Sequence, residues 1–308
     1  MSEYPIEPLD FAGLHTVPLA ARGGKVNIEQ FARPYQKGAG VAALMDSLPS
    51  LLAADSFRAI TRALLEARSR HKPIIWGLGG HVIKCGLAPV LIDLMQRGFA
   101  TAFALNGAAA IHDLEIALAG HTSEDVESVL PDGRFGVADE TGREFAAATQ
   151  ANTGLGEALG ARVQSEHSLL ARAYAHRTPV TVHVAIGTDT PHIHPACDAA
   201  ALGAATHRDF RLLCALVRQV NEGGVYINAG SAVVLPEVFL KAVSVVRNLG
   251  NPLRDFTTVN LDFLRHYRPS VNVLQRPHAN AGGHGYEIVG HHELTIPFLA
   301  AALIEAAA

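Results

Sequence analysis

The chain is poor in the features that mark several classes of protein. Three cysteines among 308 residues do not make a disulfide framework and are typical of a reducing compartment. No run of lysine or arginine occurs and the formal net charge is -4, which argues against a general nucleic-acid-binding protein. The opening residues lack the pattern of a signal peptide, and the apolar segment 294–308 is too short to cross a bilayer. We therefore expect a cytoplasmic protein with neither nucleic acid nor membrane as a partner.

What the chain does contain is a series of apolar stretches, each ending in small or polar residues where a helix-like segment begins. They cover residues 73–81, 99–106, 179–189 and 224–231. Strands that alternate with helices in this way predict a parallel sheet with right-handed crossovers. With further strands expected at 256–263 and 270–275, the sequence predicts an α/β fold: a Rossmann-like, mostly parallel sheet of at least six strands with helices on both faces.

The domain organisation is simple. Residues 1–40 are rich in proline, glycine and scattered charge, and predict an extended N-terminal arm that packs on the body or on a neighbouring subunit. The polar segment 121–142 is expected to be a surface excursion, and a helical stretch broken near 152–156 is expected over 143–177. No linker divides the remainder, so residues 41–308 are expected to form a single α/β domain.

Ionisable side chains gather where the predicted strands end. Because the carboxyl ends of parallel strands meet at the edge of the sheet that binds ligands, the turns should bring together Gly79, His81, Asn106, His112, Asp189 and His192. We predict a functional site there, with Asp189, His112 and His81 as catalytic acid–base groups. The plain alternative for any one of the sixteen histidines is a surface or hydrogen-bonded structural role.

Two of these turns are built from small residues, at 77–80 and 106–110. Such turns let backbone N–H groups approach a phosphate at a helix N-terminus. The spacing is not G-x-G-x-x-G, and no Walker lysine follows. A tight structural turn, or a close contact between helix and sheet, accounts for these residues equally well.

The segment GTDTPHIHP, residues 187–195, is the most chemically loaded part of the chain. On an extended backbone, His192 and His194 would point to one side, as in several zinc sites. Asp189 would then be a third ligand or a general base. The alternative to a metal site is a polar turn.

The glycine- and histidine-rich loop 278–292 is expected to cover a site or to contact a neighbouring subunit.

The order of these strand-end motifs resembles the deoxyhypusine synthase family. The resemblance lies in LGGHVIKCG (78–86), LNGAAAIHDLEIAL (105–118), GTDTPHIHP (187–195), GVYINAGSAV (224–233) and IPFLAAALIEA (296–306). Members of this family are homotetramers that use NAD to transfer an aminobutyl group from spermidine to a protein lysine. The resemblance implies the same fold, a homotetramer, and NAD at Gly79, Gly80, Asn106, Gly107, Gly187 and Gly230.

The departures from the family concern its chemistry. The family's catalytic lysine has no counterpart, because no lysine occurs after Lys241, and the segment 234–237 replaces the K-H-H that carries its active-site histidine. An imine with the transferred group therefore cannot form. We predict an enzyme on this scaffold that acts on a small molecule, with NAD as candidate cofactor and without deoxyhypusine synthase activity. The alternatives are a zinc-type metal enzyme using His192 and His194, and a non-catalytic ligand-binding protein.

Overall fold

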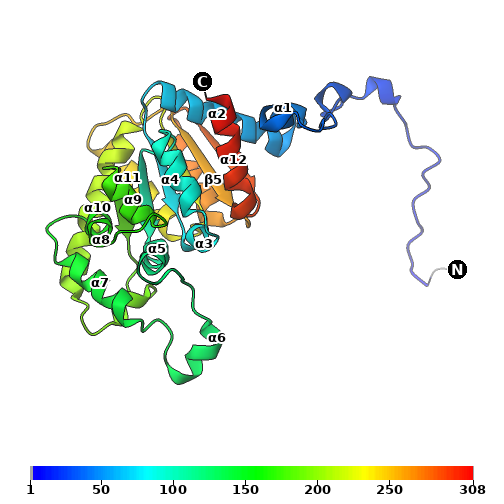
Figure 1. Ribbon diagram of the computed structural model, residues 1–308. Coiled ribbons are helices and arrows are strands. Elements are labelled where there is room, and N and C mark those ends of the chain that lie inside the picture. The colour runs from blue at the N-terminus through cyan, green and yellow to red at the C-terminus, as the bar shows by residue number, and fades with distance from the viewer. Residues whose placement is uncertain (1–2, 308) are drawn as a thin grey trace.

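The computed structural model describes residues 3–307 and is built around a six-stranded, all-parallel sheet (Figure 1). The strand order is β3-β2-β1-β4-β5-β6, so the chain winds outward in both directions from β1. This order places a topological switch point between β1 and β4. The predicted fold class is confirmed. The strands are β1 Ile74–Leu78, β2 Ala102–Asn106, β3 Val180–His183, β4 Val225–Ala229, β5 Thr257–Asp262 and β6 His284–Val289.

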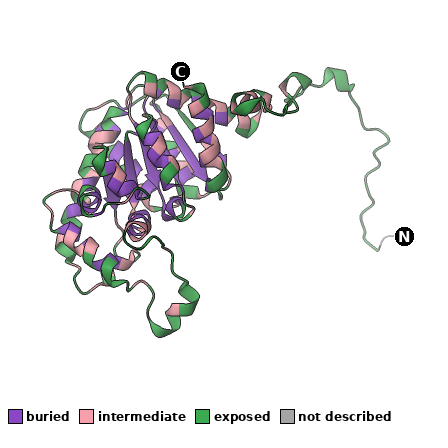
Figure 2. Cartoon of the chain, viewed as in Figure 1, coloured by how far each residue is buried: buried purple, intermediate pink, exposed green. Residues whose placement is uncertain are grey.

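Helices cover both faces of the sheet, and the strands between them are buried (Figure 2). Trp76 and Phe103 face one layer, whereas Ile75 and Tyr226 face the other, as the alternation of side chains along a strand requires. The first layer includes α2 (Leu52–Ser69), α4 (Ala88–Gln96), α9 (Leu169–Ala175) and α12 (His292–Ala306), and the second α10 (Ala199–Gln219) and α11 (Val234–Asn248). The remaining α-helices are α1 (Gly40–Ser47), α3 (Gly80–Lys84), α5 (Gly107–Ala119), α6 (Val126–Val129), α7 (Asp139–Thr149) and α8 (Leu155–Arg162). Within the described residues, no helix is long and apolar enough to cross a membrane.

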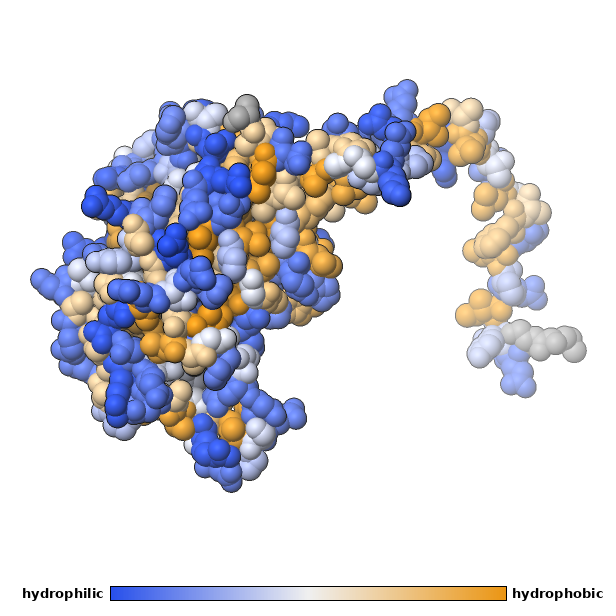
Figure 3. Space-filling model, viewed as in Figure 1, coloured by the Kyte–Doolittle hydropathy of each residue, from blue (hydrophilic) through white to orange (hydrophobic). Residues whose placement is uncertain are grey.

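The N-terminal segment projects away from this body (Figure 1). Every residue from 3 to 40 except Gln30 is exposed, and two 3-10 turns, Leu19–Ala21 and Ile28–Gln30, interrupt the extended backbone. Apolar side chains follow one another along it (Figure 3). Its packing on a neighbour, and the division of the chain at residue 40, stay predictions.

The predicted strand at 270–275 is wrong, because residues Pro269–Val273 form a short π-helix. Pro269 favours a helical start, and the Val273 carbonyl accepts a hydrogen bond from Thr258 Oγ1 at 2.7 Å instead of joining a ladder. The sixth strand is β6, which lies inside the segment that was expected to be a loop. As an edge strand that begins with exposed residues, β6 has little of the apolar signal of a buried strand.

Two other boundaries differ from the prediction. The strand expected within the stretch 179–189 ends early, at His183, because Asp189 Oδ2 accepts the Ala185 N–H at 2.8 Å and diverts the backbone. The helical stretch over 143–177 was expected to break near 152–156, and α7 and α8 are separated there; a second, unexpected break separates α8 from α9. Buried Asp113 accepts the N–H groups of Leu169 and Leu170 at the start of α9, so a new helix begins there.

Candidate active site

A cavity of about 720 Å³ opens at the carboxyl edge of the sheet, between α5 and the excursion of residues 121–138 that carries α6. Its volume lies within the range of small-molecule sites. Side chains reach it from α3, from α5, from the excursion and from the turn after β3. The polar ones include Lys84, His112, Glu115, Thr122 and Asp189.

A chain of hydrogen bonds fixes the imidazole of His112. The Thr122 hydroxyl donates a short hydrogen bond to Glu115 Oε2 and lies 2.7 Å from His112 Nδ1. Since the hydroxyl proton goes to the carboxylate, His112 Nδ1 must be the donor to the Thr122 oxygen. The lone pair of the neutral ring is then on Nε2, which has no hydrogen-bond partner within residues 3–307. His112 is thereby oriented as a proton acceptor in the cavity.

Glu115 is suited to hold this arrangement. Burial raises the pKa of Glu115, but the nearby imidazole of His112, 3.8 Å away, and the hydrogen bond from Thr122 outweigh burial and leave the pKa below its ordinary value. Thr141 Oγ1 lies 3.4 Å from the other carboxylate oxygen. The carboxylate therefore stays ionised behind the imidazole, as the third member of a base–orienter arrangement does.

Asp189 lines the same cavity and lies against the first turn of α5. A Cβ on Gly107 would overlap the Asp189 carboxylate, so only glycine fits at the start of that helix. Burial raises the pKa of Asp189, although the hydrogen bond from the Ala185 N–H and the charge of His192 oppose this. A carboxyl with a raised pKa exchanges its proton nearer to neutral pH than an exposed one.

The charges around the cavity are mostly negative. Among the lining residues that the structure describes, Lys84 is the one lysine, and there is no arginine. Four lining residues carry carboxylates: Glu115, Glu124, Glu140 and Asp189. Such a surface attracts a cationic ligand and repels an anionic one.

Some of the strand-end residues that were expected to come together do so. His112 and Asp189 line one cavity, whereas His81 is not among its lining residues. His81 lies on the other side of the switch point, with its ring centroid 5.2 Å from that of Phe263 and 5.6 Å from that of His292. These residues follow β1, β5 and β6, while His112 follows β2.

His192 and His194 do not lie on an extended segment, which corrects the local structure assumed for a metal pair. Residues Thr190–Ile193 form a 3-10 helix. His194 Nε2 lies 3.3 Å from Asp139 Oδ1 and its ring packs on Gly142. Both ring nitrogens of His192 are buried without a hydrogen-bond partner in the described chain. Metal binding by this pair stays a prediction.

Most of the residues predicted to hold NAD have roles in the packing or capping of the fold itself. Gly79 and Gly230 pack so closely that a Cβ on Gly79 would overlap the Gly230 carbonyl, and Gly80 packs against Ala108 and His112. Asn106 caps α5 by accepting the Ala109 N–H at 2.9 Å.

Of the six, Gly187 has open space beside it, with φ +86°. The N-terminus of α5, where a pyrophosphate would be favoured, is already covered by the Asp189 carboxylate. The residues present therefore do not fit a dinucleotide at α5, and NAD binding stays a prediction.

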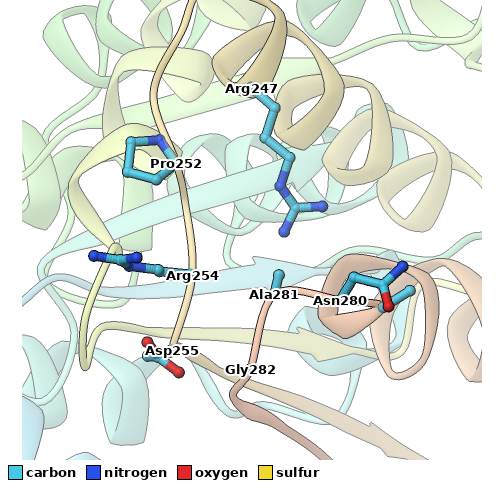
Figure 4. Close-up of a pocket in the computed structure, with 8 residues that line it drawn as sticks. Arg247, Pro252, Arg254, Asp255, Asn280, Ala281 and Gly282 are labelled. Carbon is cyan, nitrogen blue, oxygen red and sulfur yellow. The ribbon is translucent and has the colours of Figure 1, made fainter.

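A second cavity of about 490 Å³ lies at the opposite edge, before β5 and β6 (Figure 4). Arg247 is the most buried charged residue of this cavity. Its guanidinium holds two loops together by donating hydrogen bonds to the carbonyls of Leu253 and Pro277 at 2.9 and 2.6 Å. None of the predicted site residues lines it.

Sequence reasoning missed Glu115, Thr122 and Lys84. The spacing of three residues between His112 and Glu115 on a helix was available as a signal, because such residues are neighbours on the helix surface. Thr122 lies in the polar excursion, where no periodicity indicates the direction of a side chain.

No family model matches the chain, and no curated protein matches it. Solved structures share its fold. A conserved protein of Methanococcus maripaludis S2 assigned as LOR/SDH is 15% identical over 83% of this chain and 70% of that one, with a TM-score of 0.53. AgrE in its ternary complex with ornithine and NAD+ is 14% identical over 81% of this chain and 32% of that one, with a TM-score of 0.53.

A protein of Entamoeba histolytica assigned as a deoxyhypusine synthase is 9% identical over 89% of this chain and 97% of that one, with a TM-score of 0.51. At such identities the likeness shows the fold alone. The resemblance to deoxyhypusine synthases therefore holds for the fold and is not specific, because the LOR/SDH protein and AgrE match as well.

Proposed function

We propose that this chain is an enzyme that acts on a small, positively charged organic molecule by acid–base chemistry in the cavity of His112, Glu115 and Asp189. The observation that carries the proposal is the hydrogen-bonded chain from Glu115 through Thr122 to His112, which leaves Nε2 of the imidazole without a partner among the described residues, in a carboxylate-rich cavity. Acid–base catalysis needs a positioned base of this kind.

Each residue has a distinct part in the proposed chemistry. His112 Nε2 accepts a proton from the substrate, which converts the ring to an imidazolium. Glu115, acting through the Thr122 hydroxyl, stabilises that imidazolium. Asp189 accepts hydrogen bonds from a cationic group of the substrate. Proton acceptance by His112 requires a neutral ring at the start, and a ring that carries its single proton on Nδ1 makes the observed contact with Thr122 while leaving the lone pair of Nε2 for the substrate.

The proposed reaction does not pass through NAD. AgrE, which shares the fold, was solved with NAD+, and this supports testing the cofactor. In this chain, however, the Asp189 carboxylate lies where the pyrophosphate would meet α5. The ornithine in the same complex carries amino groups, which agree with the charge of the cavity described above.

Calorimetric titration with matched ligands tests the proposal. We expect L-ornithine or a short diamine to bind and succinate not to bind. Asp189→Asn and Glu115→Gln should each weaken binding by about tenfold, the effect of roughly 1.4 kcal/mol. The control His284→Gln, on β6 and outside the cavity, should bind like the wild type. Equal binding of succinate, or cationic binding that neither variant weakens, would exclude the proposal.

Turnover separates an enzyme from a non-catalytic binding protein. Protein incubated with the bound amine, with and without added NAD+, would be analysed by mass spectrometry for altered ligand. We expect product from the wild type and a decrease of about 10²-fold or more in His112→Gln. Product that forms only when NAD+ is present would show that the cofactor is needed despite the Asp189 carboxylate. Tight binding without product under either condition would support the binding protein.

A further inference from the structure

A second group of reactive side chains lies outside the cavity, on the other side of the switch point. His81 and Cys85 belong to α3 and its C-terminal cap, and Glu293 belongs to the first turn of α12. The Cys85 Sγ lies 3.3 Å from His81 Nε2 and 3.7 Å from Glu293 Oε2. One ligand atom from each of the three lies within 4.8 Å of the others.

These separations agree with a metal centre. Bond lengths of about 2.3 Å to sulfur and about 2.0–2.2 Å to nitrogen and oxygen, in a tetrahedral arrangement, place the ligand atoms about 3.4–3.6 Å apart. The two shorter observed separations bracket that range, and Glu293 is exposed and free to adjust. Binding would therefore need no movement of the backbone.

The elements that carry the three side chains are held firmly. The start of α3 is fixed by the Gly79 N–H, which donates to the Ala229 carbonyl at 2.8 Å across the switch point. The start of α12 is fixed by the fully buried ring of His292, whose Nε2 lies 3.1 Å from the Leu261 carbonyl. Since ligands on anchored elements lose little freedom on binding, the arrangement is pre-organised.

The same group is poorly suited to a nucleophilic cysteine. Cys85 caps the C-terminus of α3, where the helix dipole does not favour a thiolate. The Glu293 carboxylate lies 3.7 Å from the Cys85 Sγ. A thiolate beside a carboxylate repels it, whereas a divalent cation between them would stabilise both.

We propose that His81, Cys85 and Glu293 form a binding site for one divalent first-row metal ion of the zinc type. Imidazole, thiolate and carboxylate together are the donor set that such ions accept. Three protein ligands leave a fourth position for water, as in catalytic zinc centres. The site contains neither His192 nor His194 and does not rest on the proposed function of the cavity.

Cobalt substitution tests the site, using full-length protein purified without a histidine tag and stripped with a chelator. We expect one equivalent of Co²⁺ to bind and to produce the thiolate-to-metal charge-transfer absorption. Cys85→Ser should abolish that absorption. Glu293→Gln, at an exposed position, should weaken binding by more than about tenfold, the effect of losing even an outer-shell partner.

Cys197→Ser and Cys214→Ser are the matched controls, because both residues are free, half-buried cysteines away from the cluster. Both should keep the absorption and the affinity. Circular dichroism of each metal-free variant would show that it is folded. A charge-transfer band that survives in Cys85→Ser, an affinity unchanged in Glu293→Gln, or no stoichiometric binding by the wild type would each overturn the proposal.

Discussion

The Thr122 hydroxyl lies 2.7 Å from Nδ1 of His112 and donates its own proton to Glu115. This relationship predicts that neutral His112 carries its proton on Nδ1. Nitrogen NMR of the imidazole side chains should show that tautomer at a pH where the ring is neutral. In Thr122→Val the hydroxyl is lost, and we expect the more usual mixture of tautomers. An Nε2–H tautomer in the wild type would remove the assigned base.

The α/β sheet was predictable because near-continuous apolar stretches such as 73–78 and 224–228 are typical of strands buried on both faces of a parallel sheet. The edge strand β6 was not, since its outer residues are exposed and its composition matches a loop. Residues 270–273 alternate like a strand, yet Pro269 and the hydrogen bond from Thr258 favour a π-helix. The local sequence pattern does not show such tertiary contacts, so the π-helix could not be predicted from it.

The candidate site was predictable to the level of the sheet edge. His112 and Asp189 line one cavity because each follows a strand, and parallel strands end on one side. His81 follows a strand as well, but its ring packs near Phe263, which follows β5, and His292, which follows β6. The direction in which a turn side chain packs depends on tertiary contacts that a single sequence does not show, so the absence of His81 from the cavity lining could not be foreseen.

The contact between Gly107 and Asp189 gives a test by substitution. In Gly107→Ala the new methyl group would overlap the carboxylate, so Asp189 must turn away from α5. We expect Gly107→Ala to lower the unfolding free energy by about 1–3 kcal/mol, as overpacking does, and to weaken ligand binding. The control is Gly203→Ala, within α10, where nothing lies within 4 Å. It should be neutral or stabilising by up to about 1 kcal/mol. Equal melting temperatures for the two variants would contradict the contact.

Two buried groups should give opposite pH dependences of stability. Burial lowers the pKa of His183 to about 4, so its contribution is present above the ordinary value of about 6.5 and is lost as the pH falls from there to about 4. Burial raises the pKa of Asp209 to about 7, so its contribution is present at low pH and is lost as the pH rises toward 7. Urea unfolding at several pH values should therefore show a shallower acid loss in His183→Gln and a steeper one in Asp209→Asn. The same slope in both variants would exclude this assignment.

The missing lysine predicts the absence of the reaction that the fold suggests. Between Lys241 and Ala308 the chain contains no lysine, so no amine is available where the resembling family forms its imine. Incubation with labelled spermidine, NAD+ and the acceptor translation factor should give no more labelled acceptor than a sample without enzyme. A deoxyhypusine synthase assayed in parallel controls for the acceptor. Label transfer well above background would show that another nucleophile substitutes for the lysine.

The exposed arm predicts self-association. Eleven large apolar side chains between residues 3 and 35 are exposed, with accessible fractions from 49% at Tyr35 to 84% at Leu9. An apolar surface of this extent favours burial against a second copy of the chain, and the family resemblance suggests a homotetramer. Light scattering at micromolar concentration should give an oligomer for the wild type and a smaller species for the double variant Phe11→Glu/Phe31→Glu. Leu249→Glu places the same charge on an equally exposed residue of the body and should leave the oligomer intact. A wild-type monomer, or a loss of assembly in the control alone, would refute the role of the arm.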